Sequence, residues 1–437
     1  MSLNIIILAA GQGTRMKSSL PKVLHELSGR ALLQHVIETV EQLNPANIYI
    51  VIGYGAEQIK NYFKNYNIHW IIQKDLVGTA DAVKQVLPYL KNSSKNPDDK
   101  VLILYGDGPL ISCNTLQKLI SQTKSNQLGL ITTEINNPYG FGRIMRDNKN
   151  NIINIIEEKD ADNAQKKITE INSGIYLTSI KNLQNWLPKI KPNNSQKEFY
   201  LTDIVPMADA ITSITVENSN EVLGVNDLEQ LYQLECAHQA ELAKKFRLSG
   251  VTVSSNVRFE GEVEIGAGSK IGANSIIKNS KIGQNVEIKP NSIIEDSIIH
   301  DECTVGPFAR LRPGTVLDKK VKIGNFTEIK KSHIGEGSKV PHLSYVGDAI
   351  LGKHVNFGCG SITCNYDGIN KYQTVIADKV FIGSNSNLIA PVKIGEGAFI
   401  GAGSTITKDA PAHKLTLSRA KQTTVENWKS PTRDKKD

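Results

Sequence analysis

The first residues able to do chemistry form a glycine-rich run directly after an apolar segment. The run is Leu8-Ala9-Ala10-Gly11-Gln12-Gly13-Thr14-Arg15, followed by Pro21-Lys22. Glycines in such a turn let backbone N–H groups approach phosphate oxygens, and Arg15 and Lys22 can neutralise the phosphate charge. The run lacks the G-x-x-x-x-G-K-[ST] pattern of the P-loop and the third glycine of the dinucleotide fingerprint. By itself it indicates a phosphate site of another kind.

A second candidate is one of the nine histidines. His342 lies in the segment Pro341-His342-Leu343-Ser344-Tyr345-Val346-Gly347-Asp348. Because the unperturbed pKa of histidine is near neutral, such a side chain can take a proton from an amine. Taken alone, however, a single histidine is more often structural, so its surroundings have to decide.

The cysteines and the apolar runs exclude other classes of protein. The cysteines are odd in number and form no C-x-x-C pair, which argues against a disulfide scaffold or a thiolate zinc site; they are Cys113, Cys236, Cys303, Cys359 and Cys364. No apolar run reaches the roughly 18 residues that a membrane span needs. The run from Leu3 to Ala10 is interpreted as a buried strand rather than a signal peptide. We therefore expect a cytoplasmic protein.

Length and charge limit the architecture and the ligands. With 437 residues, the chain is expected to form two or more domains. Its 51 Lys and Arg residues against 44 Asp and Glu give a net charge of +7, which is mild for this length. Such a surface suits phosphorylated small molecules as well as nucleic acid, so charge alone selects neither.

The elements that must position the glycine run alternate between strands and helices. Short apolar segments predict strands, and amphipathic segments between them predict helices such as Leu32–Leu43 and Thr115–Thr123. The predicted strands are Ile5–Ala10, Ile48–Ile52, Trp70–Gln73, Val101–Tyr105 and Leu128–Thr132. This alternation predicts a mostly parallel sheet covered on both faces, with ligands at the carboxyl ends of the strands. A single helix, Asp227 to Leu248, follows as a linker.

From about Val251 the aliphatic residues recur every six positions. Unbroken series are Ile299, Val305, Leu311, Leu317, Ile323 and Ile329, and Ile376, Ile382, Leu388, Ile394, Ile400 and Ile406. This period is typical of a parallel β-helix with a triangular cross-section and about eighteen residues per coil. The rhythm lapses after Ile362, which predicts an insertion at about Thr363 to Thr374 that projects from the prism. Loops that leave a solenoid often carry function.

The glycine run and its companions resemble the signature of sugar-1-phosphate nucleotidyltransferases. The companions are Gln73 with Gly78-Thr79, Tyr105-Gly106-Asp107, Gly140-Phe141-Gly142-Arg143, Glu157-Glu158-Lys159, Asn172-Ser173-Gly174 and Gly224-Val225-Asn226. With the hexapeptide repeats added, residues 1 to about 430 resemble the bacterial bifunctional N-acetylglucosamine-1-phosphate uridyltransferase/glucosamine-1-phosphate acetyltransferase family. The resemblance implies a Rossmann-like α/β nucleotidyltransferase domain over 1–226, a linker helix over 227–250, and a left-handed parallel β-helix with a C-terminal tail over 251–437.

The resemblance implies a UTP and UDP-N-acetylglucosamine site in the first domain. Gly11, Gly13, Arg15 and Lys22 would hold the phosphates, Gln73, Gly78 and Thr79 the uracil, Gly142, Glu157 and Asn172 the sugar, and Asp107 and Asn226 a Mg²⁺ ion; Leu8, Ala9, Ala10, Tyr105 and Gly106 complete the implied set. Asp107 follows an apolar strand, and one carboxylate plus substrate phosphates is ordinary Mg²⁺ chemistry. The sugar phosphate would attack the α-phosphate of UTP in line, without a protein nucleophile.

Three positions depart from the family pattern. Gln12 stands where lysine is common, Gly108 separates Asp107 from Pro109, and Asp81 replaces the usual histidine. The first two side chains are not needed for the chemistry above. Asp81, in contrast, places a negative charge near the implied uracil pocket.

The surroundings of His342 match the same family. The matching segments are Arg310-Leu311-Arg312-Pro313-Gly314, Asn325-Phe326-Thr327-Glu328-Ile329-Lys330, Asn356 and Cys364-Asn365-Tyr366-Asp367-Gly368. The resemblance implies that His342 is the general base for the glucosamine amine. It further implies sugar-phosphate contacts from Arg312, Lys330, Tyr345, Asn356, Asn365 and Tyr366, and acetyl-CoA contacts from Cys359, Ser384, Ala402 and Arg419. Glu328 is expected to orient His342 or Lys330.

The resemblance thus implies an enzyme that acetylates glucosamine-1-phosphate with acetyl-CoA and then uridylylates the product, supplying a precursor of peptidoglycan and lipopolysaccharide. We expect small-molecule substrates, a homotrimer with the acetyl-transfer site between subunits, and neither nucleic acid nor membrane as partner. Two alternatives are a nucleotidyltransferase whose β-helix is only a regulatory or assembly module, and a non-enzymatic binding or scaffold protein. His342 with Asn365 and Tyr366 argues against the first, and Arg15 with Lys22 argues against the second.

Overall fold

The computed structural model describes residues 1–93 and 96–430. The chain divides into two compact units, Met1–Gln239 and Ala240–Asp437. The end of the predicted β-helix domain, residues 431–437, lies outside the described residues. In the part that the structure describes, no helix is both long and apolar enough to cross a membrane.

The N-terminal unit is built on one central sheet. In spatial order its strands are β11 (Ile211–Val216), β7 (Leu128–Glu134), β10 (Glu170–Ser179), β6 (Lys100–Tyr105), β1 (Leu3–Ala9), β4 (Asn47–Ile52) and β5 (His69–Ile72). Neighbouring strands are parallel except at β10, which runs antiparallel to both β6 and β7. The predicted mostly parallel sheet is confirmed. The antiparallel strand β10, and the hairpin of β8 (Arg143–Arg146) and β9 (Ile152–Ile156) beside it, were not predicted.

Helices cover both faces of this sheet, as the alternating pattern predicts. Successive residues of β1 point to opposite faces, so that Ile6 packs in one buried cluster and Ile5 in another. The first cluster takes its helical residues from α3 (Thr79–Ser93) and α5 (Ile180–Trp186). The second takes them from α1 (Leu32–Glu41), α2 (Ala56–Tyr62) and α4 (Cys113–Gln122). Both faces are therefore closed, and the ends of the strands are left for ligands.

Short elements follow the glycine run and the linker. The glycine run continues into two 3₁₀ turns, Thr14–Met16 and Lys22–Leu24, and a hairpin of β2 (Glu26–Leu27) and β3 (Arg30–Ala31). The predicted linker helix is α6 (Leu228–Leu248). The first half of α6 carries Leu234, which is buried with Leu27 and Leu32 in the N-terminal unit. The second half carries Phe246, whose ring packs at a tilt against that of Phe259 in the β-helix.

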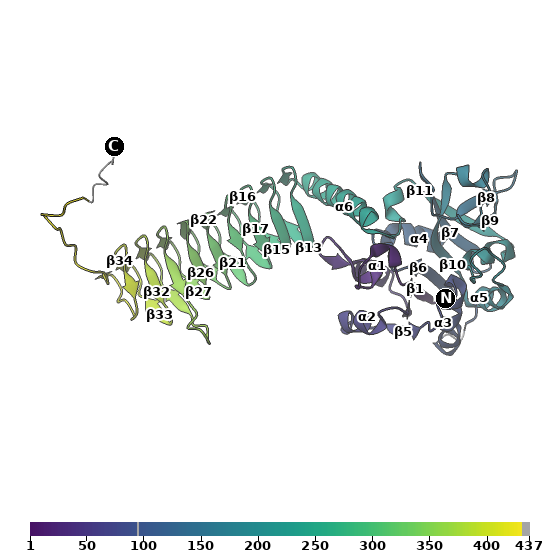
Figure 1. Ribbon diagram of the computed structural model, residues 1–437, viewed down its shortest axis with the longest axis horizontal. Helices are drawn as coiled ribbons and strands as arrows, with labels where there is room; N and C mark the ends of the chain where they lie inside the picture. The colour runs from purple at the N-terminus through teal and green to yellow at the C-terminus, as the bar shows by residue number, and fades with distance from the viewer. Residues whose placement is uncertain (94–95, 431–437) are drawn as a thin grey trace, which may run out of the picture. The chain divides into compact units, whose positions relative to one another are not determined.

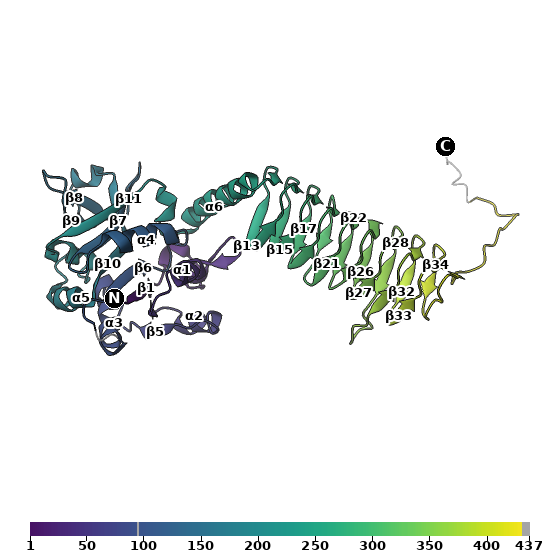
Figure 2. The ribbon, with the colours of Figure 1, turned by 180° about the vertical axis from the view of Figure 1, so that it is seen from behind.

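The C-terminal unit is a parallel β-helix with three faces, and Figure 1 and the reverse view in Figure 2 show its coils stacked in chain order. The first face carries β12 (Thr252–Val253), β14 (Lys270–Ile271), β16 (Glu287–Ile288), β19 (Thr304–Val305), β22 (Lys322–Asn325), β25 (Lys339–His342), β28 (Asn356–Phe357), β31 (Phe381–Ile382), β34 (Phe399–Ile400) and β36 (Leu415–Thr416). The other two faces meet in β15 (Ile276–Ile282), which pairs with β13 (Arg258–Ile265). One continues through β17 (Ile293–Glu295), β20 (Arg310–Leu311), β23 (Glu328–Lys330), β26 (Tyr345–Gly347), β29 (Ile362–Cys364), β32 (Asn387–Ile389) and β35 (Thr405–Ile406). The other continues through β18 (Ser297–Ile299), β21 (Thr315–Leu317), β24 (His333–Ile334), β27 (Ala349–Leu351), β30 (Thr374–Ile376) and β33 (Val392–Ile394).

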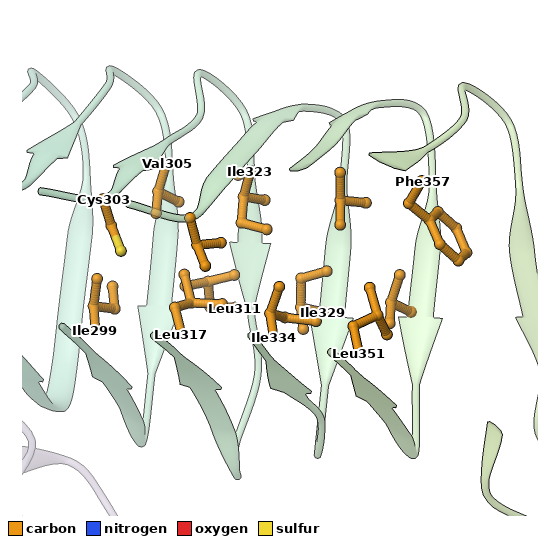
Figure 3. Packing of buried hydrophobic residues seen from close by; sticks show 14 of the residues in the cluster. Ile299, Cys303, Val305, Leu311, Leu317, Ile323, Ile329, Ile334, Leu351 and Phe357 are labelled. Carbon is orange, nitrogen blue, oxygen red and sulfur yellow. The ribbon is translucent and has the colours of Figure 1, made fainter. Parts of the chain in front are cut away.

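The six-residue aliphatic series fills the inside of these coils, as predicted. Ile299, Val305, Leu311, Leu317, Ile323 and Ile329 are at most 1% exposed, and Figure 3 shows them stacked within the prism. Ile299 pairs with Leu317 on the next coil, and Val305 pairs with Ile323. Each coil therefore repeats the same aliphatic corner, and these corners form one continuous apolar core.

The predicted insertion lies between β29 and β30. Before it, hydrogen bonds between neighbouring coils join residues 17 apart, as in Val355 to Ser338. Across it the equivalent bond, from Ser386 to Ser361, joins residues 25 apart. Tyr366 and Ile369 in the inserted loop are 59% and 87% exposed, so the loop projects from the coil as expected.

Candidate functional site

A cavity of about 440 Å³ lies where β1, β5 and β6 end. The predicted residues that line it are Leu8, Ala9, Ala10, Gly11, Arg15, Lys22, Gln73, Gly78, Thr79, Tyr105, Asp107, Gly142, Glu157, Asn172 and Asn226. This is the position in which open parallel sheets bind their ligands. The structure thus brings most of the predicted nucleotide-sugar residues to one concave site.

Two predicted residues are not among those that line the cavity. Gly13 has a positive φ of 62° and begins a 3₁₀ turn, and a Cβ there would lie 2.7 Å from the Cβ of Lys22. Gly106 donates its N–H to the carbonyl of Leu8, and a Cβ there would meet Leu33 at 3.1 Å. Both glycines allow close packing behind the site rather than forming its surface.

At one end of the cavity two cations contact two oxygen-bearing side chains. The Arg15 guanidinium donates to Asn226 Oδ1 over 2.9 Å, and the Lys22 ammonium forms a short ion pair with Asp107. Asn226 is held in place because the N–H of Val225 donates to the carbonyl of Asp107. Residues more than 200 positions apart therefore converge on one polar cluster.

This cluster fits a magnesium ion that shares ligands with a substrate. A carboxylate oxygen and an amide oxygen, from Asp107 and Asn226, are the hard ligands that Mg²⁺ prefers. Among the described residues, no three acidic, histidine or cysteine side chains gather to form a complete metal site. An ion here would take its remaining ligands from phosphates and water, as Mg²⁺ commonly does.

A buried carboxylate lies at another part of the same cavity. Burial raises the pKa of Glu157, and the Thr202 hydroxyl donates to its Oε1 over 3.4 Å, which opposes that rise. Gly142 keeps space beside it, since a Cβ there would lie 3.5 Å from both carboxylate oxygens. The neighbouring Glu158 instead pairs with the buried Arg143 at 2.6 Å. Glu157 is thus the acceptor that faces the cavity.

Asn172 is fixed next to this carboxylate by partners at both ends of its amide. Its Nδ2 donates to the hydroxyl of Tyr176 over 2.7 Å, and its Oδ1 accepts from the N–H of Gly174 over 3.0 Å. Tyr176 is fully buried, and burial raises the pKa of its hydroxyl. The orientation of Asn172 is therefore set before any ligand binds.

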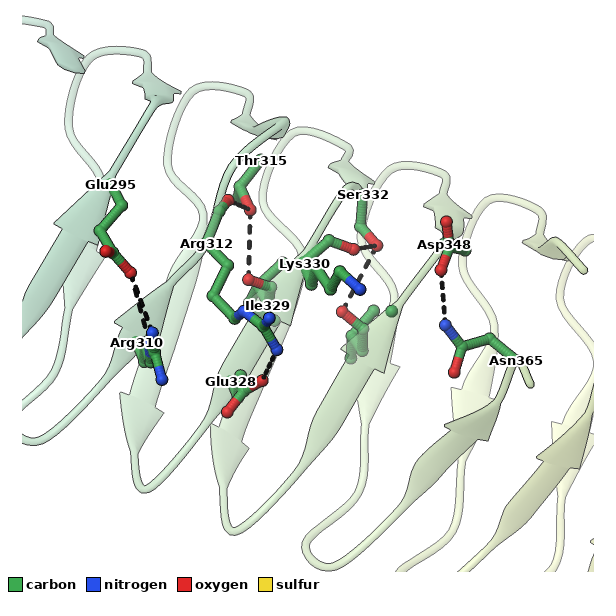
Figure 4. A network of polar contacts seen from close by, with 12 residues as sticks. Glu295, Arg310, Arg312, Thr315, Glu328, Ile329, Lys330, Ser332, Asp348 and Asn365 are labelled. Atoms are coloured by element: carbon green, nitrogen blue, oxygen red, sulfur yellow. Dashed lines mark hydrogen bonds and ion pairs between the residues drawn. The ribbon is translucent and has the colours of Figure 1, made fainter. Parts of the chain in front are cut away.

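In the β-helix, cationic residues gather on adjacent coils. Arg312 and Glu328 form an ion pair of 2.7 Å, and Lys330 lies beside them (Figure 4). The ammonium of Lys371, from the inserted loop, is the main cause of a lowered pKa at Lys330. Two ammonium groups held this close favour an anion between or beside them. The expected role of Glu328 differs, since its partner is Arg312 rather than His342 or Lys330.

His342 is oriented by the preceding coil. Its Nδ1 lies 2.7 Å from Asn325 Oδ1, and the two residues are direct partners in the pairing of β22 with β25. Because a carbonyl oxygen only accepts, Nδ1 carries the proton in this contact and Nε2 is left basic. His342 is exposed to solvent. The sequence contained the signal for this pair, since residues 17 apart face each other on neighbouring coils.

The predicted acetyl-CoA residues follow one corner of the last coils. The carbonyl of Cys359 accepts from the N–H of Asn385, and the carbonyl of Ser384 accepts from the N–H of Gly403. Arg419 then donates to the carbonyl of Ala402 over 2.8 Å. These contacts bring Cys359, Ser384, Ala402 and Arg419 together in register, and the last three are exposed.

The remaining predicted sugar residues are placed around the inserted loop. Asn365 is buried and donates to Asp348 over 2.5 Å, as Figure 4 shows, whereas Tyr366 is exposed. Tyr345 pairs with Glu328 and lies against Gly347, and Asn356 pairs with Lys339. Burial raises the pKa of Cys364, so this thiol is a poor nucleophile at neutral pH.

Comparison with known proteins gives the family. Residues 5–154 match a MobA-like NTP transferase domain, residues 248–325 a GMPPB C-terminal domain, and residues 373–408 six bacterial transferase hexapeptide repeats. The bifunctional protein GlmU of Coxiella burnetii is 47% identical over 99% of this chain and 100% of its own. GlmU of Marinobacter nauticus is 45% identical over 98% of this chain and 99% of its own. GlmU of Legionella pneumophila is 46% identical over the full length of both chains.

The NTP transferase match agrees with the cavity of the N-terminal unit, and the hexapeptide repeats agree with the β-helix. The relatives are similar to this chain over its whole length. The chain therefore belongs to the bifunctional GlmU family and is an enzyme of UDP-N-acetylglucosamine synthesis, with uridyltransferase and glucosamine-1-phosphate acetyltransferase activities.

Proposed function

We propose that the cavity of the N-terminal unit transfers UMP from UTP to N-acetylglucosamine-1-phosphate. The observation that carries this assignment is the convergence of Arg15, Lys22, Asp107 and Asn226 at one end of the cavity. Arg15 and Lys22 are cations that exchange their present partners for phosphate oxygens. Their charge then stabilises the α-phosphate under attack and the departing pyrophosphate.

Asp107 and Asn226 would hold the Mg²⁺ ion. When bound, the ion would neutralise charge on the phosphates. The phosphate oxygen of N-acetylglucosamine-1-phosphate forms a bond to the α-phosphorus of UTP, and the bond to the pyrophosphate oxygen breaks. This displacement needs positioning and neutralisation rather than a protein nucleophile.

The sugar lies, in this proposal, at the end of the cavity that holds Glu157 and Asn172. The Glu157 carboxylate accepts from sugar hydroxyls, and the preset amide of Asn172 supplies a further polar contact. The uracil lies near Gln73, Gly78 and Thr79, which line another part of the cavity wall. At Gly78, a Cβ would lie 2.4 Å from the carbonyl of Phe199, so only glycine fits there.

We assign acetyl transfer to the surface of the β-helix around His342. Nε2 removes a proton from the amine of glucosamine-1-phosphate as its nitrogen attacks the thioester carbon of acetyl-CoA. The C–S bond then breaks, and coenzyme A leaves as a thiolate that can take up the proton. Asn325 supports this role because it holds the Nδ1–H tautomer. Arg312 and Lys330 bind the sugar phosphate, and Lys371 joins them.

Acetyl-CoA is assigned to the corner formed by Cys359, Ser384, Ala402 and Arg419. Backbone groups at successive coils offer regular hydrogen-bonding positions along this corner. The guanidinium of Arg419 suits a phosphate of the coenzyme because it can donate two parallel hydrogen bonds. Tyr345, Asn356, Asn365 and Tyr366 complete the proposed surroundings of the sugar.

We further propose a homotrimer whose acetyl-transfer site lies between subunits. Phe308, Phe326 and Leu343 occupy the same corner of three successive coils and are 50%, 57% and 59% exposed. All three have positive φ values, 53°, 54° and 49°, which are costly for bulky residues. Exposed apolar side chains kept at such positions, one of them next to His342, support a subunit contact here.

One incubation tests both assignments. Purified protein, glucosamine-1-phosphate, acetyl-CoA, UTP and Mg²⁺ should give UDP-N-acetylglucosamine, and omission of acetyl-CoA should stop its formation. Supplying N-acetylglucosamine-1-phosphate should then restore it. Uridylylation without any acetylation would leave the β-helix a regulatory module, and the absence of both reactions would leave the chain a scaffold.

A further inference from the structure

Asp81 lies behind the residue that we assign to the uracil. It occupies the first turn of α3 and is not among the residues that line the cavity, whereas Gln73 lines the cavity and is only 4% exposed. Gln73 Nε2 donates to the Asp81 carboxylate over 2.9 Å and to the carbonyl of Gly78 over 3.1 Å. Asp81 therefore touches the side chain that faces the ligand without facing the ligand itself.

These two contacts fix which way the amide of Gln73 points. A backbone carbonyl and a carboxylate can only accept hydrogen bonds, so the NH₂ group must face them. A flipped amide would set Oε1 against two acceptors. In the described ranges 1–93 and 96–430, Oε1 of Gln73 makes no hydrogen bond. The amide oxygen is thus the polar atom of Gln73 that remains for a ligand.

We propose that Asp81 is a specificity-determining positioning residue, which makes Gln73 present an acceptor and so favours a base with an N–H donor on its pairing edge. Uracil has such a donor at N3, and cytosine has an acceptor at the same atom. This inference rests on the proposed function, in which Gln73 contacts the base. Asp81, which stands where the family usually has histidine, would thus favour UTP over CTP.

The expected effect follows from the freedom that the amide gains. Without Asp81 only the Gly78 carbonyl restrains Nε2, so the amide can turn and offer a donor to cytosine. Sites that hydrogen-bond a particular group strongly reject analogues that lack it, by about 10⁴- to 10⁵-fold. We expect Asp81→Ala to lower the UTP-to-CTP ratio of kcat/KM by about tenfold or more. Asp81→Asn should lower it less, because the asparagine oxygen can still accept from Nε2.

The experiment uses the full chain with N-acetylglucosamine-1-phosphate and measures pyrophosphate release from UTP and from CTP. Gln85→Ala is the matched control, since Gln85 also donates to Asp81, over 3.2 Å, and no hydrogen bond among the described residues joins it to Gln73. This control should keep the wild-type ratio. The KM for N-acetylglucosamine-1-phosphate should be unchanged in all three variants, because the sugar end of the cavity is untouched.

Two results would overturn the inference, and they are distinguishable. If Asp81→Ala keeps the wild-type ratio while Gln73→Ala lowers it, Asp81 is only an acid that stabilises the start of α3. If Gln73→Ala also keeps the ratio, the placement of the uracil against Gln73 in the proposed function is itself wrong.

Discussion

The two candidate sites differ in how far this chain encloses them. In the N-terminal unit, Gln73, Glu157 and Asn172 line a cavity closed by loops from one sheet. On the β-helix, His342 and Tyr366 are exposed, and the proposed ligands lie along the outside of the coils. The cause is architectural. Loops at the end of a doubly wound sheet can surround a ligand, whereas a prism filled with aliphatic residues has only outer faces.

From this difference we infer that the nucleotide site is complete in a single chain and that the acetyl-transfer site is not. On an open surface, water competes with the amine for the thioester carbon, so an acetyl-transfer site gains from a second wall that excludes water. Phe308 and Phe326 stack with their ring centroids 5.3 Å apart beside this surface. We therefore expect a neighbouring subunit to supply that wall.

Removal of the Asp107 carboxylate should abolish one activity and leave the other, and it has the largest effect that we expect. Asp107→Ala should lower uridylyl transfer by about 10³-fold or more, because the ion that neutralises the phosphates loses its charged ligand. Acetylation by the same protein should be unchanged, and is measured separately by release of free coenzyme A. If both activities fell together in a folded variant, the division into two independent sites would be wrong.

The converse variant is His342→Ala. It should lower acetyl transfer by about 10²- to 10⁴-fold, the usual contribution of a general base. Uridylylation of supplied N-acetylglucosamine-1-phosphate should persist. Asn325→Ala should cause a smaller loss, about tenfold, because it releases the imidazole tautomer. A loss below tenfold in His342→Ala would make this histidine a structural residue.

The next largest effect that we expect is a pH dependence of sugar binding in the N-terminal cavity. Burial raises the pKa of Glu157, so its protonated form persists to higher pH than in an exposed glutamate. Protonation removes acceptors for the sugar hydroxyls. The KM for N-acetylglucosamine-1-phosphate should therefore rise as pH falls through this raised pKa, by up to about tenfold per pH unit. In Glu157→Gln the KM should be higher at neutral pH and flat with pH. A wild-type KM that does not change on acidification would remove Glu157 from the sugar site.

The smallest expected effect concerns the stability of the N-terminal unit. His35 and His238 lie edge to face at 5.9 Å, near Arg30, Glu38 and Glu235, and burial lowers the pKa of His238 to about 4. In the unfolded chain this histidine binds a proton near pH 6.5, whereas in the folded chain it stays neutral down to about pH 4. Its contribution to the free energy of unfolding is therefore full above pH 6.5 and is lost as the pH falls from 6.5 toward 4. At pH 5 the loss is about 1–2 kcal/mol.

Thermal unfolding at pH 7 and pH 5 measures this loss. The transition of the N-terminal unit should move to lower temperature in the wild type, and His238→Gln should reduce that shift. The β-helix transition serves as the internal reference. A shift that is equal in His238→Gln and in the wild type would assign the effect to other groups.

Much of the fold followed from the sequence because both units repeat a simple pattern. The six-residue period predicted the buried aliphatic corners from Ile299 to Ile329, and the alternating apolar runs predicted the strands around β1. The antiparallel strand β10 was not predicted, since Asn172, Ser173 and Gly174 interrupt its apolar residues. Pairing direction depends on neighbours that a single segment does not encode.

The site residues were predicted by motif, and their partners were not. Asn325 could have been found from the coil length, because it precedes His342 by 17 residues. Lys371 could not, since the inserted loop has no repeat that places its side chains. The contact of Asp81 with Gln73 depends on how the start of α3 meets the end of β5, which the spacing of the two residues leaves open.

The nucleotide site is expected to be complete in one chain, and the acetyl-transfer site is expected to require a neighbouring subunit. Phe308→Asp combined with Phe326→Asp should weaken the proposed subunit contact, because two exposed apolar rings at one corner would become charged. Sedimentation, with both activities measured on each separated species, tests the claim most directly. We predict that monomers keep uridylyl transfer and lose acetyl transfer, while trimers carry out both. A monomer that acetylates glucosamine-1-phosphate at the full rate would contradict it.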